Sequence, residues 1–324
     1  MGSVVVLGST ITDLVAQAPR LPIPGEAVIG EDFATFLGGK GFNQAVAAAR
    51  LGASVRFIGR VGTDTFGDDF SSALSNEGID NSHLSRDPSA GTGTACVMIG
   101  TDIGQNAIIV LPRANLALSA EMVEEAIQSI LSRSTTLVNT SIFMAQCEMR
   151  MATIAAGLRF AHSAGMITIF NAAPVPREPF PVDLFTYVDI LVVNESEAAG
   201  IAETPVDTPQ SARRAATRLL IKGVKNTIIT LGAQGCVWST IGNSEGQFSH
   251  RWIRTIPVTQ VDATAAGDAF CGALAAKLAE GLVMSEALRW ANAAGAIAVT
   301  RLGALPSLPT TEEVEALLRE ANKD

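Results

Sequence analysis

Hydrophobic positions along the chain alternate between short continuous runs and longer stretches with helical spacing. The apolar runs at 4–7 and 190–193 are typical of strands buried on both faces of a parallel sheet. The stretch 41–51 has helical spacing and stops at Gly52, a residue that commonly ends helices. Further strands are expected at 55–58, 137–141, 167–170 and 227–231, and further helices at 66–76, 119–133, 149–164, 195–200 and 211–222. This alternation predicts an α/β fold with a mostly parallel sheet and helices on both faces.

Two segments depart from the alternation. Residues 26–37 and 94–111 have strand character, and no helix is expected inside either of them. We interpret them as a small sheet that projects from the core as a lid over a cleft; an edge extension of the main sheet is the alternative. The chain is therefore expected to form one domain over 1–324, with lid segments at about 14–37 and 94–112 inserted in the core.

Composition and charge restrict the classes of function. Hydrophobic residues make up 48% of the 324 residues and charged residues only 17%, so a large buried core is expected. The net charge of −9 argues against nucleic-acid partners and anionic membranes. The sequence contains no apolar stretch long enough to predict a transmembrane helix. The 4 cysteines are scattered and no secretory leader is recognised, so we expect a cytoplasmic location.

Three common signatures fail on inspection. Residues 8–10 follow the first strand but lack the later glycines of a dinucleotide-binding turn, which disfavours a nicotinamide-dependent oxidoreductase. Residues 39–41 contain Gly-Lys-Gly without the Ser or Thr of a phosphate-binding P-loop. Residues 242–246 match the hydrolase pattern G-x-S-x-G, but they lie between two expected strands, 236–240 and 247–252, where a hairpin turn is the better interpretation.

A glycine-rich segment at 38–45, GGKGFNQA, is the first motif that carries chemistry. Its three glycines allow a backbone to pass close to a ligand, and the helix that follows presents free amides. Lys40 and Asn43 add polar groups suited to binding hydroxyls. An ordinary glycine-rich turn is the structural alternative.

The second motif, DATAAGDAF at 262–270, opens a predicted helix. Small side chains at 265–267 leave the amides of the helix N-terminus open to an anion, which the helix dipole also favours. Asp268 could cap this helix, or it could act as a general base toward a hydroxyl. A base beside an anion site is what phosphoryl transfer to an alcohol requires.

Two further motifs follow expected strands, at the sheet edge where open α/β sheets bind ligands. Asn194 and Glu197 come directly after the strand at 190–193 and offer oxygen ligands suited to Mg²⁺, which they are expected to hold through waters. Capping of the next helix by Asn194 is the alternative. The loop at 230–235 is either a tight turn or a loop that contacts a nucleotide.

Together these motifs resemble the ribokinase-like (PfkB) carbohydrate kinase family, over nearly the whole chain. The two signatures are GGKGFNQA at 38–45 and DATAAGDAF at 262–270. Blocks that point to the ribokinase branch are PGE at 24–26, RAN at 113–115, NESEA at 194–198 and AVTRLGALPS at 298–307. The resemblance implies a three-layer α/β/α core with a β lid that often joins two copies as a homodimer.

The activity that the resemblance implies is transfer of phosphate from ATP to the 5-hydroxyl of a pentose, with D-ribose giving D-ribose 5-phosphate. The same family leaves 2-deoxyribose, a nucleoside or an acidic sugar such as 2-keto-3-deoxygluconate open as substrates. A non-catalytic sugar-binding regulator on the same fold is the alternative of another class.

The resemblance also assigns site residues. Asp268 is implied as the catalytic base, and the anion hole comprises Ala265, Ala266 and Gly267. The sugar positions are Ile11, Asp13, Gly39, Lys40, Asn43, Arg113 and Glu148. The nucleotide positions are Asn194, Thr230, Gly232 and Asn292, with Glu197 holding Mg²⁺ through water. The loop for an activating monovalent cation, K⁺, comprises Asp262, Thr264, Ala298, Arg301, Gly303 and Ser307.

Two sugar positions depart from the family pattern. Ile11 stands where the family has Asn or Met, so one hydrogen bond to the sugar, of about 0.5–1.5 kcal/mol net, is missing. Arg113 replaces a small residue and matches an arginine of members that act on acidic sugars. Because of these two departures, the sequence does not decide which sugar accepts the phosphate.

Overall fold

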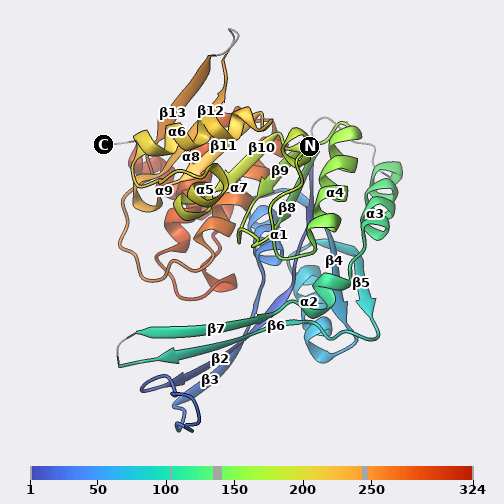
Figure 1. The fold of residues 1–324 in the computed structure, drawn as a ribbon, viewed down its shortest axis with the longest axis vertical. Coiled ribbons are helices and arrows are strands. Elements are labelled where there is room, and N and C mark those ends of the chain that lie inside the picture. The colour runs from blue at the N-terminus through green and yellow to red at the C-terminus, as the bar shows by residue number, and fades with distance from the viewer. Residues whose placement is uncertain (1, 103, 134–140, 243–246, 323–324) are drawn as a thin grey trace.

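The computed structural model describes residues 2–102, 104–133, 141–242 and 247–322, and its largest element is a nine-stranded sheet (Figure 1). The strand order is β13-β12-β11-β10-β9-β8-β1-β4-β5. The parallel strands are β1 (Ser3–Leu7), β4 (Ser54–Gly62), β5 (Asp80–Asp87), β8 (Ile142–Gln146), β9 (Ile167–Asn171), β10 (Ile190–Val193) and β11 (Asn226–Thr230). Two antiparallel strands, β12 (Cys236–Ile241) and β13 (Phe248–Ile253), extend one edge.

Helices cover both faces of this sheet. One face packs α1 (Lys40–Arg50), α2 (Thr65–Asn76), α7 (Ala266–Glu280), α8 (Met284–Ala298) and α9 (Thr311–Ala321). The other packs α3 (Ala120–Arg133), α4 (Met151–Ser163), α5 (Glu195–Ala202) and α6 (Pro209–Ile221). The alternation within β1 explains the two layers, because Val4 and Val6 belong to the first core and Val5 and Leu7 to the second. The predicted three-layer α/β/α architecture is confirmed.

A separate four-stranded sheet projects from this body (Figure 1). Its order is β3 (Asp32–Gly38), β2 (Ile11–Ala18), β6 (Gly93–Gly100) and β7 (Gln105–Leu111). The central strand β2 pairs parallel with β6 and antiparallel with β3. The small sheet expected from 26–37 and 94–111 is therefore present, while its strand β2 was not among the expected elements because its alternation includes the polar Thr12, Asp13 and Gln17.

Two expected elements fall partly on residues that the structure leaves undescribed. For the strand expected at 137–141, residues 137–140 lie outside the described ranges, and the strand that pairs with β1 is β8, five residues further along, with Leu7 opposite Ala145. For the turn expected at 242–246, residues 243–246 also lie outside them, but β12 and β13 on either side pair antiparallel, with Ile241 opposite Phe248.

The end of β1 and the start of α1 touch backbone to backbone. The Phe42 amide donates to the Ser9 carbonyl at 3.0 Å. A Cβ atom on Gly41 would lie 2.1 Å from the Cα of Gly8, a distance that no side-chain atom tolerates. Gly39 has φ +93°, a conformation that favours glycine, and its own Cβ would lie 2.9 Å from the Ser9 oxygen. Glycine is required here because any side chain would push α1 away from the sheet.

We predict that Gly41→Ala destabilises the fold by about 1–3 kcal/mol or more, because the added methyl group meets backbone that cannot retreat. Urea unfolding would measure the change in the free energy of unfolding. Gly200→Ala is the matched control: this α5 glycine has nothing within 4 Å of its Cβ position, so alanine should stabilise by about 0.5–1 kcal/mol. Equal behaviour of the two variants would contradict the close-approach argument.

Candidate active site

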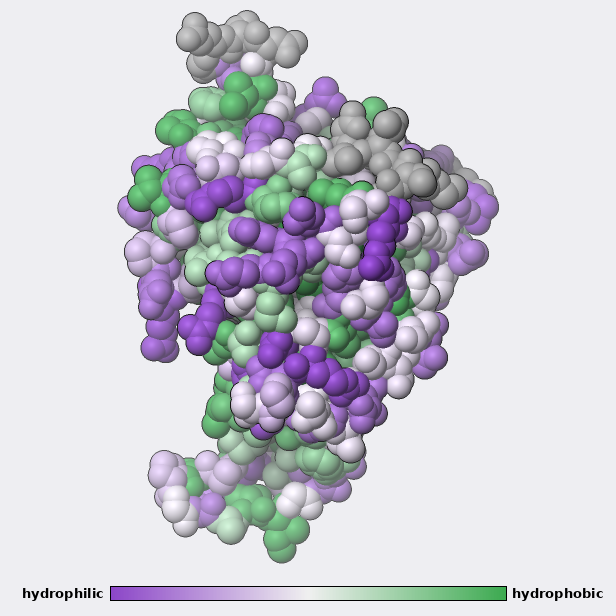
Figure 2. All heavy atoms as spheres, turned by 90° about the vertical axis from the view of Figure 1, so that its right-hand side faces the viewer, coloured by the Kyte–Doolittle hydropathy of each residue, from purple (hydrophilic) through white to green (hydrophobic). Residues whose placement is uncertain are grey.

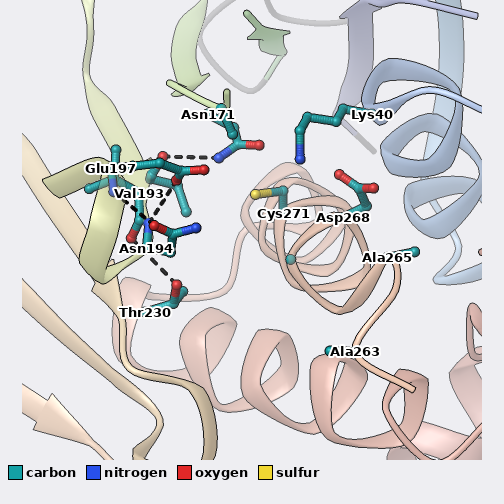
Figure 3. Close-up of a pocket in the computed structure, with 13 residues that line it drawn as sticks. Lys40, Asn171, Val193, Asn194, Glu197, Thr230, Ala263, Ala265, Asp268 and Cys271 are labelled. Atoms are coloured by element: carbon teal, nitrogen blue, oxygen red, sulfur yellow. Dashed lines mark hydrogen bonds between the residues drawn. The ribbon is translucent and has the colours of Figure 1, made fainter. Parts of the chain in front are cut away.

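A cavity of about 190 Å³ opens where the carboxyl ends of β9, β10 and β11 face the N-terminus of α7 (Figure 3). Asn171, Val193 and Thr230 are the last residues of those three strands, and all three line the cavity. The remaining lining residues are Lys40, Ala173, Val192, Asn194, Glu197, Ala263, Ala265, Gly267, Asp268 and Cys271. Residues expected from both signature motifs therefore meet in one wall.

Asp268 is buried at the third position of α7, with 6% of its surface exposed. Its carboxylate accepts hydrogen bonds from Asn43 Nδ2 at 3.0 Å and from Gln44 Nε2 at 2.9 Å. It does not cap the helix, because the N-cap position belongs to Ala265 and carries no side-chain cap bond. The capping alternative for Asp268 is thus not what the structure has.

The carboxylate of Asp268 and the ammonium of Lys40 point toward one another across the cavity (Figure 3). Burial raises the pKa of Asp268, although Lys40 and the two amide donors oppose that rise. Burial lowers the pKa of Lys40, but the negative charges of Asp268, Glu148 and Glu197 outweigh it and leave the pKa above its usual value. Lys40 is therefore a cation held among carboxylates.

The N-terminus of α7 forms the floor of the cavity. Ala265 adopts the left-handed region with φ 60°, and this turns the chain into the helix. A Cβ on Gly267 would meet nothing within 4 Å, so this position opens directly into space. Amides of the first helical turn lack partners within the helix, and together with the helix dipole they favour an anion. The Ala266 amide already donates to the Ala263 carbonyl at 3.3 Å.

A second cluster of carboxylates lies beside the glycine-rich loop. Glu148 accepts hydrogen bonds from the Ser9 hydroxyl and, at 2.8 Å, from the Lys40 amide. Asp13, on β2, has its pKa raised to about 6, mainly by burial and also by the charge of Glu148. Gly38 leaves room for this carboxyl, since a Cβ there would lie 2.8 Å from Asp13 Oδ2. Such acceptors suit the hydroxyls of a sugar.

Two of the residues predicted to bind the sugar differ in character. The Oδ1 atom of Asn43 is buried and has no hydrogen-bond partner among the described residues, so it is free to accept from a ligand hydroxyl. Ile11 is an apolar residue with 4% exposure at the start of β2, opposite Gly38.

Arg113 is not among the residues that line this cavity. It has φ 47°, its Nη1 donates to the Thr92 carbonyl at 3.3 Å, and its guanidinium occupies the space that a side chain at Gly91 would need. Burial raises the pKa of Asp64, but hydrogen bonds from Thr92 and Gly67, together with the charge of Arg113, lower it below its usual value. The guanidinium of Arg113 is therefore occupied by contacts within the protein.

On the nucleotide side, Asn194 caps α5 and also lines the cavity. Its Oδ1 accepts from the Glu197 amide at 2.9 Å, and Glu197 Oε2 accepts from the Asn194 amide at 2.8 Å. Asn194 therefore caps the helix, and its role toward a ligand stays a prediction. Gly232 and Asn292 do not line this cavity: Gly232 lies in the turn after β11, and Asn292 Nδ2 donates to the Ile253 carbonyl at 3.1 Å.

The two segments expected to hold a monovalent cation lie side by side. Asp262 accepts from the Thr264 amide at 2.9 Å and the Thr264 hydroxyl at 2.7 Å, and from the Gly303 amide at 2.9 Å. Burial raises the pKa of Asp262, but these bonds lower it below its usual value. Arg301 pairs with Glu313, and the hydroxyl of Ser307 donates to the Ala304 carbonyl. The Ala298 carbonyl accepts a hydrogen bond from the Arg301 amide.

Backbone carbonyls and one ionised carboxylate are the oxygen donors that suit K⁺. Within the described ranges, no group of three or more His, Cys, Asp or Glu side chains could hold a metal ion. A monovalent cation at the Asp262 loop stays a prediction from the sequence.

Sequence reasoning missed three buried amide residues. Gln44 lies inside the first motif and Asn171 in a block that departs mildly from the family pattern, but neither received a role, and Gln146 was not singled out. All three are joined by hydrogen bonds beneath Asp268. A signal was available, because Gln146 and Asn171 are polar residues at the ends of apolar strands, the edge at which such sheets bind ligands.

A buried carboxylate beside a lysine and a helix N-terminus defines a site suited to phosphoryl transfer. Residues 1–311 match the pfkB family of carbohydrate kinases, and the chain belongs to this family. The predicted family is thus confirmed, and with it the class of enzyme.

Relatives match over almost the full length. Ribokinase of Mus musculus is 37% identical, covering 98% of this chain and 94% of its own. Deoxyribokinase of Salmonella typhi is 30% identical, covering 97% of this chain and 98% of its own. The structure of Arabidopsis thaliana ribokinase complexed with ribose and ATP superimposes with a TM-score of 0.86 at 30% identity, covering 98% of this chain and 99% of that one. Among the described residues, no helix is long and apolar enough to cross a membrane.

Proposed function

We propose that this chain transfers the terminal phosphate of ATP to the 5-hydroxyl of D-ribose and releases D-ribose 5-phosphate. The observation that carries the proposal is the buried Asp268 carboxylate, which faces Lys40 at the N-terminus of α7. Similarity to a ribokinase bound to ribose and ATP supports the same pair of substrates.

In this proposal Asp268 takes the proton of the 5-hydroxyl as that oxygen attacks phosphorus. The amides of 265–268 at the N-terminus of α7 stabilise the negative charge on the transferred phosphoryl group. Lys40 supplies a positive charge between the sugar side and the nucleotide side. Glu148, Asp13 and Asn43 hold the hydroxyls of the sugar.

Asn194 and Glu197 would hold Mg²⁺ through waters. The capping box leaves one oxygen of Glu197 outside its hydrogen bonds, and both residues line the cavity, which fits this role. A bound Mg²⁺ would neutralise charge on the ATP phosphates. Thr230 lies at the same wall, whereas Gly232 and Asn292 would contact the nucleotide beyond it.

We predict that Asp268→Asn lowers kcat by roughly 10²–10⁴, the range expected for a lost general base, while ATP affinity stays within a few-fold. Steady-state kinetics with ribose and equilibrium ATP binding would measure the two effects separately. Thermal unfolding serves as the control for an intact fold. Retention of more than about a tenth of the wild-type kcat would remove Asp268 as the base.

The acceptor is the finer part of the proposal. The Arg113 guanidinium lies against Gly91 and donates to the Thr92 carbonyl, which argues against a role in binding an acidic sugar. Ile11 offers no hydrogen bond at the sugar side, so 2-deoxyribose is the second candidate, supported also by the similarity to a deoxyribokinase.

For the acceptor we predict that kcat/KM for ribose and for 2-deoxyribose differ by less than about tenfold, since one hydrogen bond to the 2-hydroxyl is missing. Ile11→Asn should shift the ratio toward ribose by up to about tenfold, the equivalent of one net hydrogen bond. Arg113→Ala should leave ribose kinetics unchanged. A keto-deoxy acid that outperforms ribose, with a preference lost in Arg113→Ala, would instead show that the acceptor is acidic.

We also propose that K⁺ binds in the Asp262 loop and orders the adjoining N-terminus of α7. The residues that would hold it or shape its loop are Asp262, Thr264, Ala298, Arg301, Gly303 and Ser307. The fit rests on the paired segments and on the ionised Asp262 described above.

Replacing Na⁺ by K⁺ at constant ionic strength should raise both kcat and the melting temperature, because a ligand bound to the folded state stabilises it. Tetramethylammonium provides the control cation, since it is too large for the loop. Identical rates and melting temperatures in all three salts would exclude the cation site.

The projecting sheet is proposed as a lid on a single kinase domain spanning 1–324, and as the contact between two copies. It exposes large apolar side chains on its outer strands: Phe33, Phe36, Ile108, Ile109, Val110 and Leu111. Figure 2 shows apolar residues at this projecting end of the molecule. Apolar surface of this kind typically marks an interface between proteins.

Sedimentation equilibrium should therefore find a homodimer, which Ile109→Glu converts to monomer because a charge would be buried in the contact. Ile221→Glu is the matched control: this residue is 70% exposed on α6, far along the chain from the lid, and its variant should remain dimeric. A monomeric wild-type protein would refute the contact.

The cytoplasmic location stays a proposal. It is supported by the four cysteines, all of them free, as expected in a reducing compartment.

A further inference from the structure

A chain of three buried amide side chains runs beneath the candidate site and ends on Asp268. Gln146 Nε2 donates to Gln44 Oε1 at 2.8 Å, and Gln44 Nε2 donates to Asn171 Oδ1 and to Asp268 Oδ1, both at 2.9 Å. Asn171 Nδ2 donates to the Val192 carbonyl at 3.0 Å. Gln44 and Gln146 have no exposed surface. The chain joins β8, β9 and β10 to α1 and α7.

The donor and acceptor roles in this series of hydrogen bonds are fixed by the bond at one end, to the Val192 carbonyl. The Val192 carbonyl can only accept, so the nitrogen of Asn171 must face it and the Asn171 oxygen must face Gln44. That oxygen requires a donor, so the nitrogen of Gln44 must face Asn171, and its second hydrogen reaches Asp268. Gln44 Oε1 is then left to accept from Gln146. Gln44 cannot turn over without breaking three bonds.

Gln44 and Asn43 divide the carboxylate between them but differ in what remains free. Asn43 donates to Asp268 Oδ2 and keeps an unpartnered oxygen within the described part of the chain. Gln44 has both of its amide hydrogens and its oxygen engaged by the protein. Gln44 therefore has nothing left to offer a substrate, and its effect on the reaction must pass through Asp268.

We infer that Gln44 is a positioning residue, which fixes the plane of the Asp268 carboxylate and keeps that group an acceptor of protons. The inference rests on the proposed role of Asp268 as the base. With one N–H donor on each oxygen, the carboxylate cannot rotate, and the lone pairs left over face the cavity and the acceptor hydroxyl. Donors to a carboxylate stabilise its ionised form.

The charges around Asp268 show why such a donor matters. Lys40 of α1 favours ionisation, while burial opposes it. Glu148, which follows β8, and Glu197 of α5 are further carboxylates that face the same Lys40, and the Cys271 thiol lies one helical turn further along α7. Lys40 is thus shared among three carboxylates, whereas Gln44 and Asn43 act on Asp268 directly.

The test is the pH dependence of kcat with ribose in Gln44→Met and Gln44→Glu. Methionine has a similar length and no donor, and glutamate presents an oxygen to the carboxylate. We expect the acid limb of the profile to move to higher pH by about one unit or more, and kcat at neutral pH to fall at least about tenfold. KM for ribose should change less than about threefold, because Gln44 does not touch the sugar.

Thr168→Val is the matched control. Thr168 is a fully buried residue of β9 whose hydroxyl donates to the Tyr187 carbonyl at 2.7 Å, at the opposite end of the strand from Asn171. Its loss should lower the melting temperature and leave the acid limb in place. A folded Gln44→Met enzyme with an unmoved acid limb and normal kcat would overturn the inference.

Gln146→Met tests the same inference through the residue that donates to Gln44. It is the deciding variant if the Gln44 variants do not fold. Its loss frees Gln44 Oε1, so the acid limb should move in the same direction by a smaller amount, and no shift would overturn the inference. Failure of the proposed function is distinguishable, because the wild-type protein would then not phosphorylate ribose, and failure of the base role alone would leave Asp268→Asn active. An inactive Asp268→Asn with unmoved Gln44→Met and Gln146→Met profiles would reject the positioning role alone.

Discussion

The arrangement of the site depends on two places where glycine lets α1 approach closely. At its start, Gly41 contacts the Cα of Gly8 at the end of β1, so the helix begins directly on the sheet edge. Along its length, α1 meets α7 at Gly272, where a Cβ would lie 2.5 Å from the Cβ of Ala47 and 2.7 Å from the Gln44 carbonyl. These contacts bring Asn43 and Gln44 within hydrogen-bond distance of Asp268, although 224 residues separate Gln44 from Asp268.

The same geometry explains how so many charges are kept within one small volume. Burying a carboxylate is costly unless it is paired and hydrogen-bonded. Asp268 has Lys40 as a counter-charge and two amide donors, and Glu148 has the Ser9 hydroxyl and the Lys40 amide. Lys40 therefore serves twice, through its backbone amide and through its ammonium. A site built in this way is ordered before any ligand arrives, which lowers the reorganisation required during the reaction.

The small sheet has a different physical character from the core. Its strand β2 starts at Ile11 beside the site and runs outward, so one end supplies Asp13 while the other end lies in solvent. Its outer strands are too exposed to form a core of their own, because side chains on both faces of β7 remain accessible. Such exposed apolar side chains are expected in an element that becomes buried when it packs against another surface.

Much of the fold and part of the site could be read from sequence, because they depend on local patterns. Apolar runs such as 190–193 are buried wherever a parallel sheet forms, and the glycines of 38–41 report a backbone constraint that acts over a few residues. The capping box of Asn194 and Glu197 is local in the same way. Strand β2 was not predicted, because its polar positions are compatible with a strand only once β3 and β6 pair with it. Tertiary structure alone decided that Gln44, Gln146 and Asn171 meet, and that Arg113 donates to the Thr92 carbonyl. Such partners are distant in sequence and are joined by packing, so they leave no periodic signal along the chain.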